Sequence, residues 1–267
     1  MKLFFLALVL AASNATAQTK SEGVEVHKSR MLLLPASTVE RSASQQYVQL
    51  MRTAQEKGAL NRDSAQLARL RRIAAEMIPH AKRFNANAAQ WRWEVNLLSS
   101  KTVNAFCMPG GKIAFFTGII DSLQLTDDEI ATIMGHEIGH ALLEHGRARM
   151  SEQVAKNVGI SIAAAVFNLG QLSTELLAQG ANLAVSLPYA RSQESDADLV
   201  GLELAARAGY DPRAAVSVWH KMSRFAESAG KGQPPQFLST HPANDARIKQ
   251  IEANLPRVLP LYEKAKP

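Results

Sequence analysis

One stretch of twelve residues constrains this chain more than any other. MGHEIGHALLEH, from Met134 to His145, places three histidines and two glutamates within an apolar run. Upstream, Thr126 and Glu129 have the spacing of a capping box, which marks the start of a helix. The pattern predicts a largely buried helix that stops near Gly146. The apolar residues that recur at helical spacing are Ile130, Ile133, Met134, Ile138, Ala141 and Leu142.

The titratable residues of this helix have the spacing of a metal site. His136 and His140 are four residues apart, so both imidazoles project from one face, one turn apart. Two nitrogens in that position can bind a single Zn²⁺. Glu137 is directed beside the metal, where it can accept a proton from a water molecule that zinc activates, as in the H-E-x-x-H pattern of zinc peptidases. The alternative is a pair of hydrogen-bonded core histidines next to a buried carboxylate, with no metal.

Two glycines on the same helix predict that another part of the chain packs closely against it. Gly135 and Gly139 should each cost about 1 kcal/mol relative to alanine inside a helix. A helix that keeps both of them, four residues apart, is expected to let another element approach closely.

Two further polar residues nearby are not expected to bind the metal. His145 lies nine residues after the first histidine, whereas the metzincin pattern requires ten residues and a glycine where this chain has Leu143. Glu144 shares a face with the second histidine, but three ligands in one line along a helix cannot surround a tetrahedral ion. We expect Glu144 to be structural, in a pair with Arg147 or Arg149.

The third ligand should come from a second helix. In YARSQESDADLVGLELAARAG, Glu194 and Asp198 are four residues apart on a helix with an apolar side. Glu194 can bind the zinc, and Asp198 can accept the outer N–H of a ligating histidine. The alternative is that both are surface acids paired with Arg191 or Arg207.

The rest of the chain indicates a mainly α fold with a small β-sheet (α+β). Few aromatic residues and 46% hydrophobic residues suit one helical core. We expect helices over 39–57 and 63–82, a strand over 91–98, a hairpin of TVNAFCM and KIAFF around Pro109-Gly110-Gly111, and helices after Thr117. Residues 154–187 are rich in Ala, Leu and Val, but no apolar run reaches ~18 residues. They predict a helical hairpin or lid, with a face that allows peripheral membrane contact.

The N-terminal stretch has the layout of a secretory signal. MKLFFLALVLAASNATAQ has one lysine, an apolar run and Ala15-Thr16-Ala17, which predicts a signal peptide over 1–17 and a flexible leader over 18–38. With Cys107 as the one cysteine, no internal disulfide is possible, and a periplasmic location is expected. The formal charge of +6 is scattered, without a nucleic-acid-binding motif, so no nucleic-acid partner is expected.

HEIGH, QESDAD and STHP with Arg247 occur here in that order. This combination, with VNAFCMPGGKIAFFTGII upstream, resembles the HtpX-like zinc metallopeptidases, a family that includes the CAAX prenyl endopeptidases and the periplasmic BepA and LoiP proteases. The chain is most similar to the short periplasmic type. The resemblance implies a zincin-like metallopeptidase domain over 39–255, followed by a tail over 256–267. It also implies one Zn²⁺ per chain and a place at the site for His241.

Several roles remain open at this point. Pro242 suits the first position of a helix, so His241 can cap that helix, donate to the oxyanion of the transition state or occupy the fourth zinc position. Arg247 either supports the site or binds substrate. A peptide can lie along the strand edge at Asn104 and Ala105, although plain sheet packing would explain these residues equally well. We expect a zinc endopeptidase that acts on unfolded or envelope proteins in quality control; the alternative is a zinc-stabilised chaperone or assembly factor that rarely cleaves.

Overall fold

The computed structural model describes residues 22–27, 31–158, 188–228, 235–242 and 244–266. It is mainly helical with one small sheet, as the sequence predicts. The helices and 3₁₀ turns are α1 (Ala36–Glu56), α2 (Ser64–Met77), η1 (Ile78–Arg83), η2 (Ala86–Gln90), α3 (Thr117–Leu123), α4 (Asp127–Leu142), α5 (His145–Val158), α8 (Arg191–Arg207), α9 (Ala214–Ser228), α10 (Gln236–Thr240) and α11 (Asp245–Ala265).

The sheet has three strands in the order β1-β3-β2. β2 (Ala105–Met108) and β3 (Lys112–Phe116) form the predicted antiparallel hairpin, and β1 (Glu94–Leu98) pairs parallel to β3. Gly111 turns the hairpin at φ +79°, where a Cβ would lie 2.7 Å from the Trp93 ring. Because β3 is central, β2 lies at an edge of this sheet.

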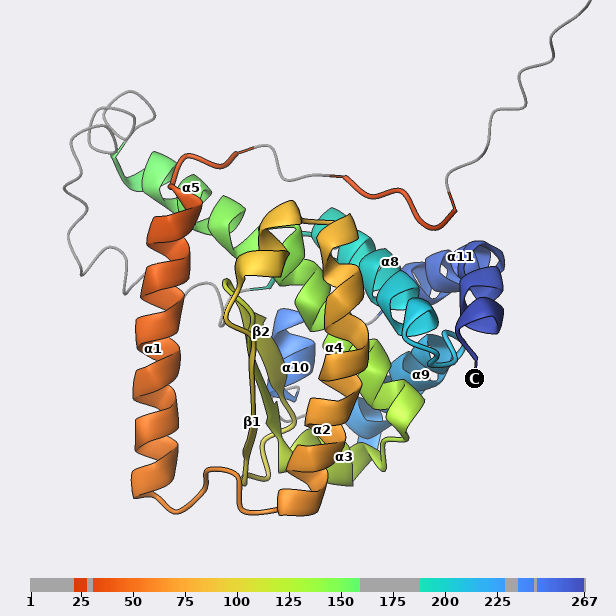
Figure 1. Ribbon diagram of the computed structural model, residues 1–267, viewed down its shortest axis with the longest axis horizontal. Coiled ribbons are helices and arrows are strands. Elements are labelled where there is room, and N and C mark those ends of the chain that lie inside the picture. The colour runs from red at the N-terminus through yellow and green to blue at the C-terminus, as the bar shows by residue number, and fades with distance from the viewer. Residues whose placement is uncertain (1–21, 28–30, 159–187, 229–234, 243, 267) are drawn as a thin grey trace, which may run out of the picture.

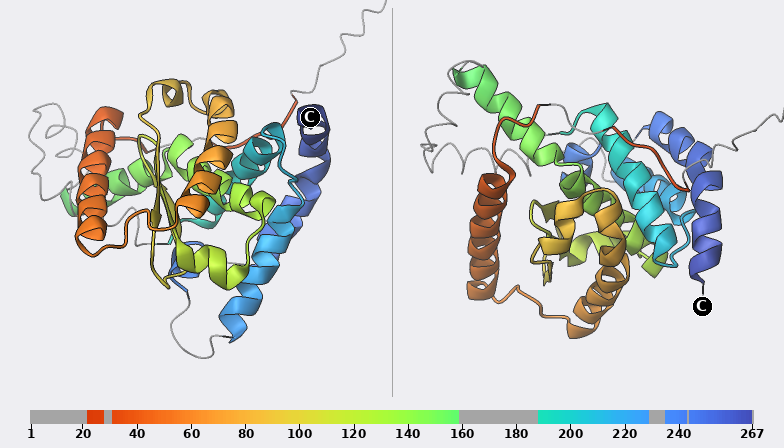
Figure 2. Two further views of the ribbon diagram at one scale, coloured as in Figure 1. Left: turned by 60° about the horizontal axis from the view of Figure 1, so that its bottom comes forward. Right: turned by 45° about the horizontal axis from the view of Figure 1, so that its top comes forward.

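The helices lie on both faces of the sheet. Figures 1 and 2 show α1 on one side and α2, α4 and α8 on the other. The smaller apolar core joins α1 to one sheet face through residues such as Tyr47 and Phe106. The larger core joins the opposite face to α2, α4, α8 and α9. The predicted helix of the H-E-x-x-H pattern is therefore enclosed, and His136, Glu137 and His140 are all buried.

The crossing of α4 and α8 depends on three glycines. A Cβ on Gly135 would lie 2.9 Å from the Cα of Gly201, and one on Gly201 would lie 2.7 Å from the main-chain nitrogen of His136. A Cβ on Gly139 would lie 3.0 Å from the carbonyl oxygen of Ala197. The predicted close approach at Gly135 and Gly139 is thus confirmed. It brings the first turn of α8 against the histidines of α4.

The end of α4 differs from the sequence prediction. The capping box of Thr126 and Glu129 is present, but the helix ends at Leu142 rather than near Gly146. Glu144 adopts the left-handed conformation at φ +56°, and α5 begins at the next residue. The stop is therefore made by a glutamate, whose side chain pairs with Arg147 at 2.6 Å.

Both ends of the described chain pack on the body. In residues 22–27, part of the expected leader, the main-chain N–H of Val24 donates to Glu203 on α8 at 2.7 Å. Residues 256–265, expected as a tail, continue α11 and bury Val258 and Leu261. The expected signal peptide and most of the 154–187 hairpin lie outside the described residues. Among the helices that are described, none has the length and apolar character needed to cross a bilayer.

Candidate metal centre

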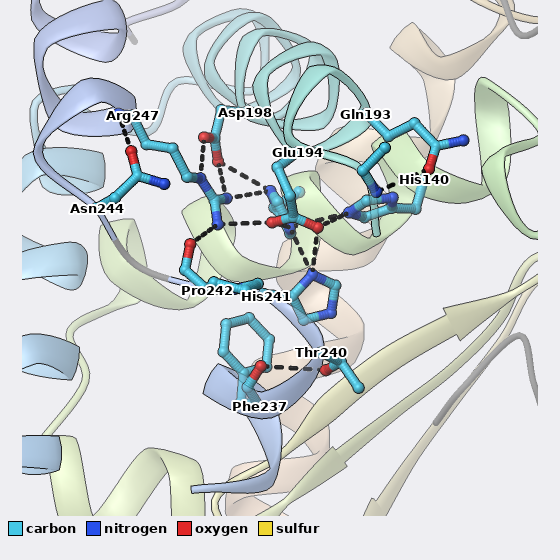
Figure 3. A network of polar contacts seen from close by, with 12 residues as sticks. His140, Gln193, Glu194, Asp198, Phe237, Thr240, His241, Pro242, Asn244 and Arg247 are labelled. Carbon is cyan, nitrogen blue, oxygen red and sulfur yellow. Dashed lines mark hydrogen bonds and ion pairs between the residues drawn. The ribbon is translucent and has the colours of Figure 1, made fainter. Parts of the chain in front are cut away.

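Three separate elements bring four possible ligands together. α4 supplies His136 and His140, the first turn of α8 supplies Glu194, and His241 follows α10. One ligand atom from each of the four lies within 4.8 Å of all the others. Figure 3 shows His140, Glu194 and His241 directed toward one another. The nearest contacts include 3.1 Å between the Nε2 atoms of the two α4 histidines and 3.3 Å from His140 Nε2 to Glu194 Oε1.

The donor set fits zinc. Imidazole nitrogens and a carboxylate oxygen are ordinary Zn²⁺ ligands in tetrahedral sites. All four residues are at most 3% exposed, so burying them together without a cation would place several polar groups in close, poorly satisfied contact. His136, His140, Glu194 and His241 would hold the ion.

His136 is supported from behind by a buried ion pair. Its Nδ1 lies 2.9 Å from Asp198 Oδ1, which leaves Nε2 directed toward the other ligands. Arg247 donates to both oxygens of Asp198, at 2.8 and 2.7 Å, and its guanidinium lies 3.8 Å from the centre of the Trp219 ring. Burial alone would raise the pKa of Asp198, but the charge of Arg247 and the contact with His136 hold it below its usual value.

Arg247 also pairs with the ligand carboxylate itself. Its Nη1 lies 2.6 Å from Glu194 Oε2. Burial opposes ionisation of Glu194, yet the neighbouring His241 and His140 keep its pKa lowered. Arg247 therefore supports the site, one of the two roles that its sequence position left open, by neutralising two buried carboxylates.

His140 is supported differently, by aromatic residues. Its Nδ1 lies 2.9 Å from Nδ1 of His145, which is 1% exposed. The Tyr189 ring stacks on the His140 ring with centroids 3.8 Å apart, and Arg149 lies 3.9 Å over the tyrosine. Burial lowers the pKa of His140 well below its usual value and that of His145 to about 3. This side of the site therefore holds its imidazoles neutral.

Glu137 has the surroundings of a general base. The carboxylate is buried, and Oε1 makes no hydrogen bond within the described residues, although His241 Nε2 lies 3.4 Å away. Burial is the main cause of its raised pKa, and the neighbouring His241 and His136 partly offset it. A carboxylate whose pKa moves toward neutrality is better matched to accepting a proton.

His241 lies at the centre and is the C-cap of α10, but it does not N-cap the following helix. It follows α10, and Asn244 is the N-cap of α11, accepting a hydrogen bond from the N–H of Arg247. Pro242 is consequently not the first residue of a helix, which rules out the capping role. Nδ1 of His241 lies 3.0 Å from Glu194 Oε1 and 3.2 Å from His136 Nε2.

A cleft opens beside these groups. Its lining includes Asn104 and Ala105, together with Glu137, His140 and His241. The apolar remainder comes from α1, β2 and α5, including Val39, Phe106, Met108 and Met150. The two residues expected to contact a peptide therefore lie in the same hollow as the metal site.

The fold and site define a class of protein: a mainly helical, metal-dependent domain with two histidines from an H-E-x-x-H helix and a glutamate from a second helix. The chain belongs to peptidase family M48, whose profile matches residues 64–255. The resemblance predicted from the sequence is thus confirmed.

Similar proteins carry metalloprotease names. The chain is 38% identical over 164 residues to the mitochondrial metalloendopeptidase OMA1 of Arabidopsis thaliana, covering 61% of this chain and 32% of that protein. It is 36% identical over 166 residues to OMA1 of Schizosaccharomyces pombe, covering 62% and 47%. It is 29% identical over 153 residues to the metalloprotease LoiP of Escherichia coli, covering 57% and 58%. The chain thus spans less than two thirds of the length of each of these relatives.

The structure brings the expected ligands His136, His140 and Glu194 together. It also places three residues at the site for which the sequence predicts no such role. His145, Tyr189 and Trp219 contact the imidazoles or Arg247 directly. The spacing of His145 argues against a role as a ligand and predicts no other role. An expectation that each zinc histidine needs a partner for its outer nitrogen could have identified it.

Proposed function

We propose that this protein is a zinc-dependent metalloendopeptidase that hydrolyses peptide bonds of exported or envelope proteins. Membership of family M48 supports the reaction class. The observation that carries the proposal is the position of Glu137, a buried carboxylate beside four clustered ligands but outside that cluster. A site that only stabilised the fold would have no use for it.

In the proposed mechanism, a bound zinc ion would act as a Lewis acid that polarises the peptide carbonyl and lowers the pKa of water toward neutrality. Glu137 accepts the proton of the attacking water at Oε1 and returns it to the departing amine. His136, His140 and Glu194 remain fixed as ligands throughout.

The edge of β2 suits an extended peptide. The N–H of Phe116 donates to the carbonyl of Asn104, so the main chain of Asn104 faces β3. In an antiparallel pair the main-chain groups alternate in direction, and those of Ala105 therefore point away from β3. A substrate strand would pair with Ala105, while Asn104 contributes its side chain.

His241 has two proposed roles that one variant separates. Its present contacts support a place as fourth ligand, from which substrate displaces it. His241→Ala should then keep or increase peptidase activity while weakening zinc retention. If His241 instead donates to the oxyanion, the same variant loses about 10²–10³-fold in kcat.

The location and the substrates of the protein are proposed from its sequence and its relatives. The signal-like N-terminal sequence supports export, and the similarity to the metalloprotease LoiP of Escherichia coli supports a bacterial protease. Unfolded or envelope proteins are the corresponding substrates, and quality control is the corresponding role.

Glu137→Gln tests the proposal directly. We expect degradation of an unfolded protein such as casein to fall about 10²–10⁴-fold, because general base catalysis is lost. Zinc content should not change, since Glu137 is not a ligand. Glu252→Gln, an exposed site on α11, is the matched control and should retain activity. Full activity of Glu137→Gln, or chelator-insensitive activity of the native chain, would contradict the proposal. A native chain that binds zinc but does not degrade casein would favour the chaperone.

A further inference from the structure

His145 contacts a candidate zinc ligand, His140, although its spacing in the sequence does not predict this. It lies nine residues after the first zinc histidine and is 1% exposed, and its Nδ1 is 2.9 Å from Nδ1 of His140. The ligand cluster uses the opposite nitrogen of His140, because Nε2 is the atom near Glu194 and His136. The contact with His145 therefore occupies the nitrogen that faces away from the metal position.

We infer that His145 is a positioning residue, which accepts the outer N–H of His140 and thereby fixes the tautomer and orientation of that ligand. A metal-bound imidazole carries its hydrogen on the free nitrogen, here Nδ1. Two Nδ1 atoms at 2.9 Å require one donor and one acceptor. His140 is the donor, so His145 presents a bare Nδ1 and carries its own hydrogen on Nε2.

The packing around the pair restricts the His140 ring to this arrangement. Tyr189 covers one face of the ring at 3.8 Å with an interplanar angle of 24°. The ring of His136 meets it edge-on, at 4.7 Å and 79°. A ring confined on its face and its edge has little freedom to rotate about its side-chain bonds. His145 then determines which nitrogen is protonated.

The position of His145 depends on the turn between α4 and α5. Had α4 continued as a helix, residue 145 would lie more than one turn beyond His140 and could not reach its ring. The left-handed conformation of Glu144 ends α4 and starts α5 at His145. This turn brings the imidazole back against the preceding helix.

The inference rests on the zinc site of the proposed function, and its test measures zinc binding rather than catalysis. His145→Leu keeps the approximate volume and removes the acceptor. Competition with a chromogenic chelator should show zinc bound about 10–100-fold more weakly, the loss expected on removing such a partner. His145→Asn places an amide oxygen near the former Nδ1 and should restore most of the affinity. His220→Leu, an exposed site on α9, is the matched control.

A spectroscopic measurement separates positioning from packing. In zinc-loaded protein labelled with ¹⁵N-histidine, the Nδ1–H of His140 should exchange slowly with solvent, and more rapidly in His145→Leu. If His145→Leu is folded and binds zinc as tightly as the native chain, the inference is wrong. It is equally wrong if His145→Asn is as weak as His145→Leu, because the role is then packing alone. A native chain that binds no zinc would instead contradict the proposed function.

Discussion

The two histidines of α4 are held on opposite sides by different chemistry. On one side, His136 contacts Asp198, and Arg247 neutralises that carboxylate. On the other side, His140 contacts His145 and stacks on Tyr189. The first side is a buried network of charges between α8 and α11, and the second is a cluster of neutral rings at the start of α5.

The two sides therefore act differently on their ligands: one strengthens the binding of its imidazole, and the other mainly orients its ring. A carboxylate acceptor makes its imidazole more basic and a stronger ligand, whereas a neutral acceptor mainly orients the ring. The charged side should therefore dominate the stability of the metal-free protein, because a broken buried ion pair leaves an uncompensated charge. The neutral side should respond chiefly to pH and to loss of its hydrogen bond.

The largest effect is expected from Arg247→Leu. This change leaves Asp198 and Glu194 buried without their common cation, and should lower the free energy of unfolding by about 3–5 kcal/mol. Urea denaturation of the metal-free protein measures it. Arg213→Leu removes an exposed pair with Asp211 and should change stability by less than about 0.5 kcal/mol. A loss near that of the control would mean that the network contributes little.

A smaller loss of folding stability is expected from Gly201→Ala. Gly201 lies where α8 packs against the main chain of His136 on α4. The new methyl group would lie 2.7 Å from the main-chain nitrogen of His136, so the helices must separate. Overpacking of this kind costs about 1–3 kcal/mol. Zinc affinity should fall as well, because Glu194 moves with α8. Ser192→Ala on the exposed part of α8 is the control, and equal stability of the two variants would contradict the proposed tight crossing.

The smallest effect is a pH dependence that distinguishes the two sides. His145 has a pKa of about 3 in the folded protein, so between pH 6.5 and that value the unfolded chain binds more protons. Its contribution to stability is full above pH 6.5 and falls as the pH decreases, by at most about 1.4 kcal/mol per pH unit. On the charged side the direction is opposite for His136: Asp198 outweighs the effect of burial and raises the pKa of this histidine, so its contribution is full below about pH 6.5 and is lost as the pH rises. The pKa of Asp198 is lowered, so the contribution of this carboxylate is lost only as the pH falls below about 4.

Denaturation of the metal-free protein at pH 7, 6 and 5 tests this difference. His145→Leu should flatten the decrease in stability, and His220→Leu should leave it unchanged. An equal slope for the native chain and His145→Leu would show that His145 does not titrate with folding.

The sequence predicted what depends on spacing within one helix. Two histidines four residues apart must share a face, and so must Glu194 and Asp198; the structure brings these two faces together. The glycines predicted the close approach, although their partner Gly201 could not be inferred from α4 alone. The helix face on which each candidate ligand lies could therefore be predicted from the spacing of residues within a helix.

Unlike Asp198 and Arg247, three supporting residues, His145, Tyr189 and Trp219, could not be located from spacing alone, because their places depend on turns of the backbone and on tertiary packing. The sequence favoured Gly146 as the end of α4, whereas Glu144 makes the left-handed turn without a glycine. Tyr189 and Trp219 reach the site from segments that are brought there only by tertiary packing.

The turn at Glu144 makes the metal site sensitive to the number of residues between α4 and α5. An α-helix rotates by about 100° per residue, so inserting or deleting one residue at this junction would swing the following helix around its axis. His145 and Arg149 would both lose their places, while every ligand stayed intact in the sequence. We therefore expect a single-codon insertion at this junction to weaken zinc binding through a residue that is not itself a ligand.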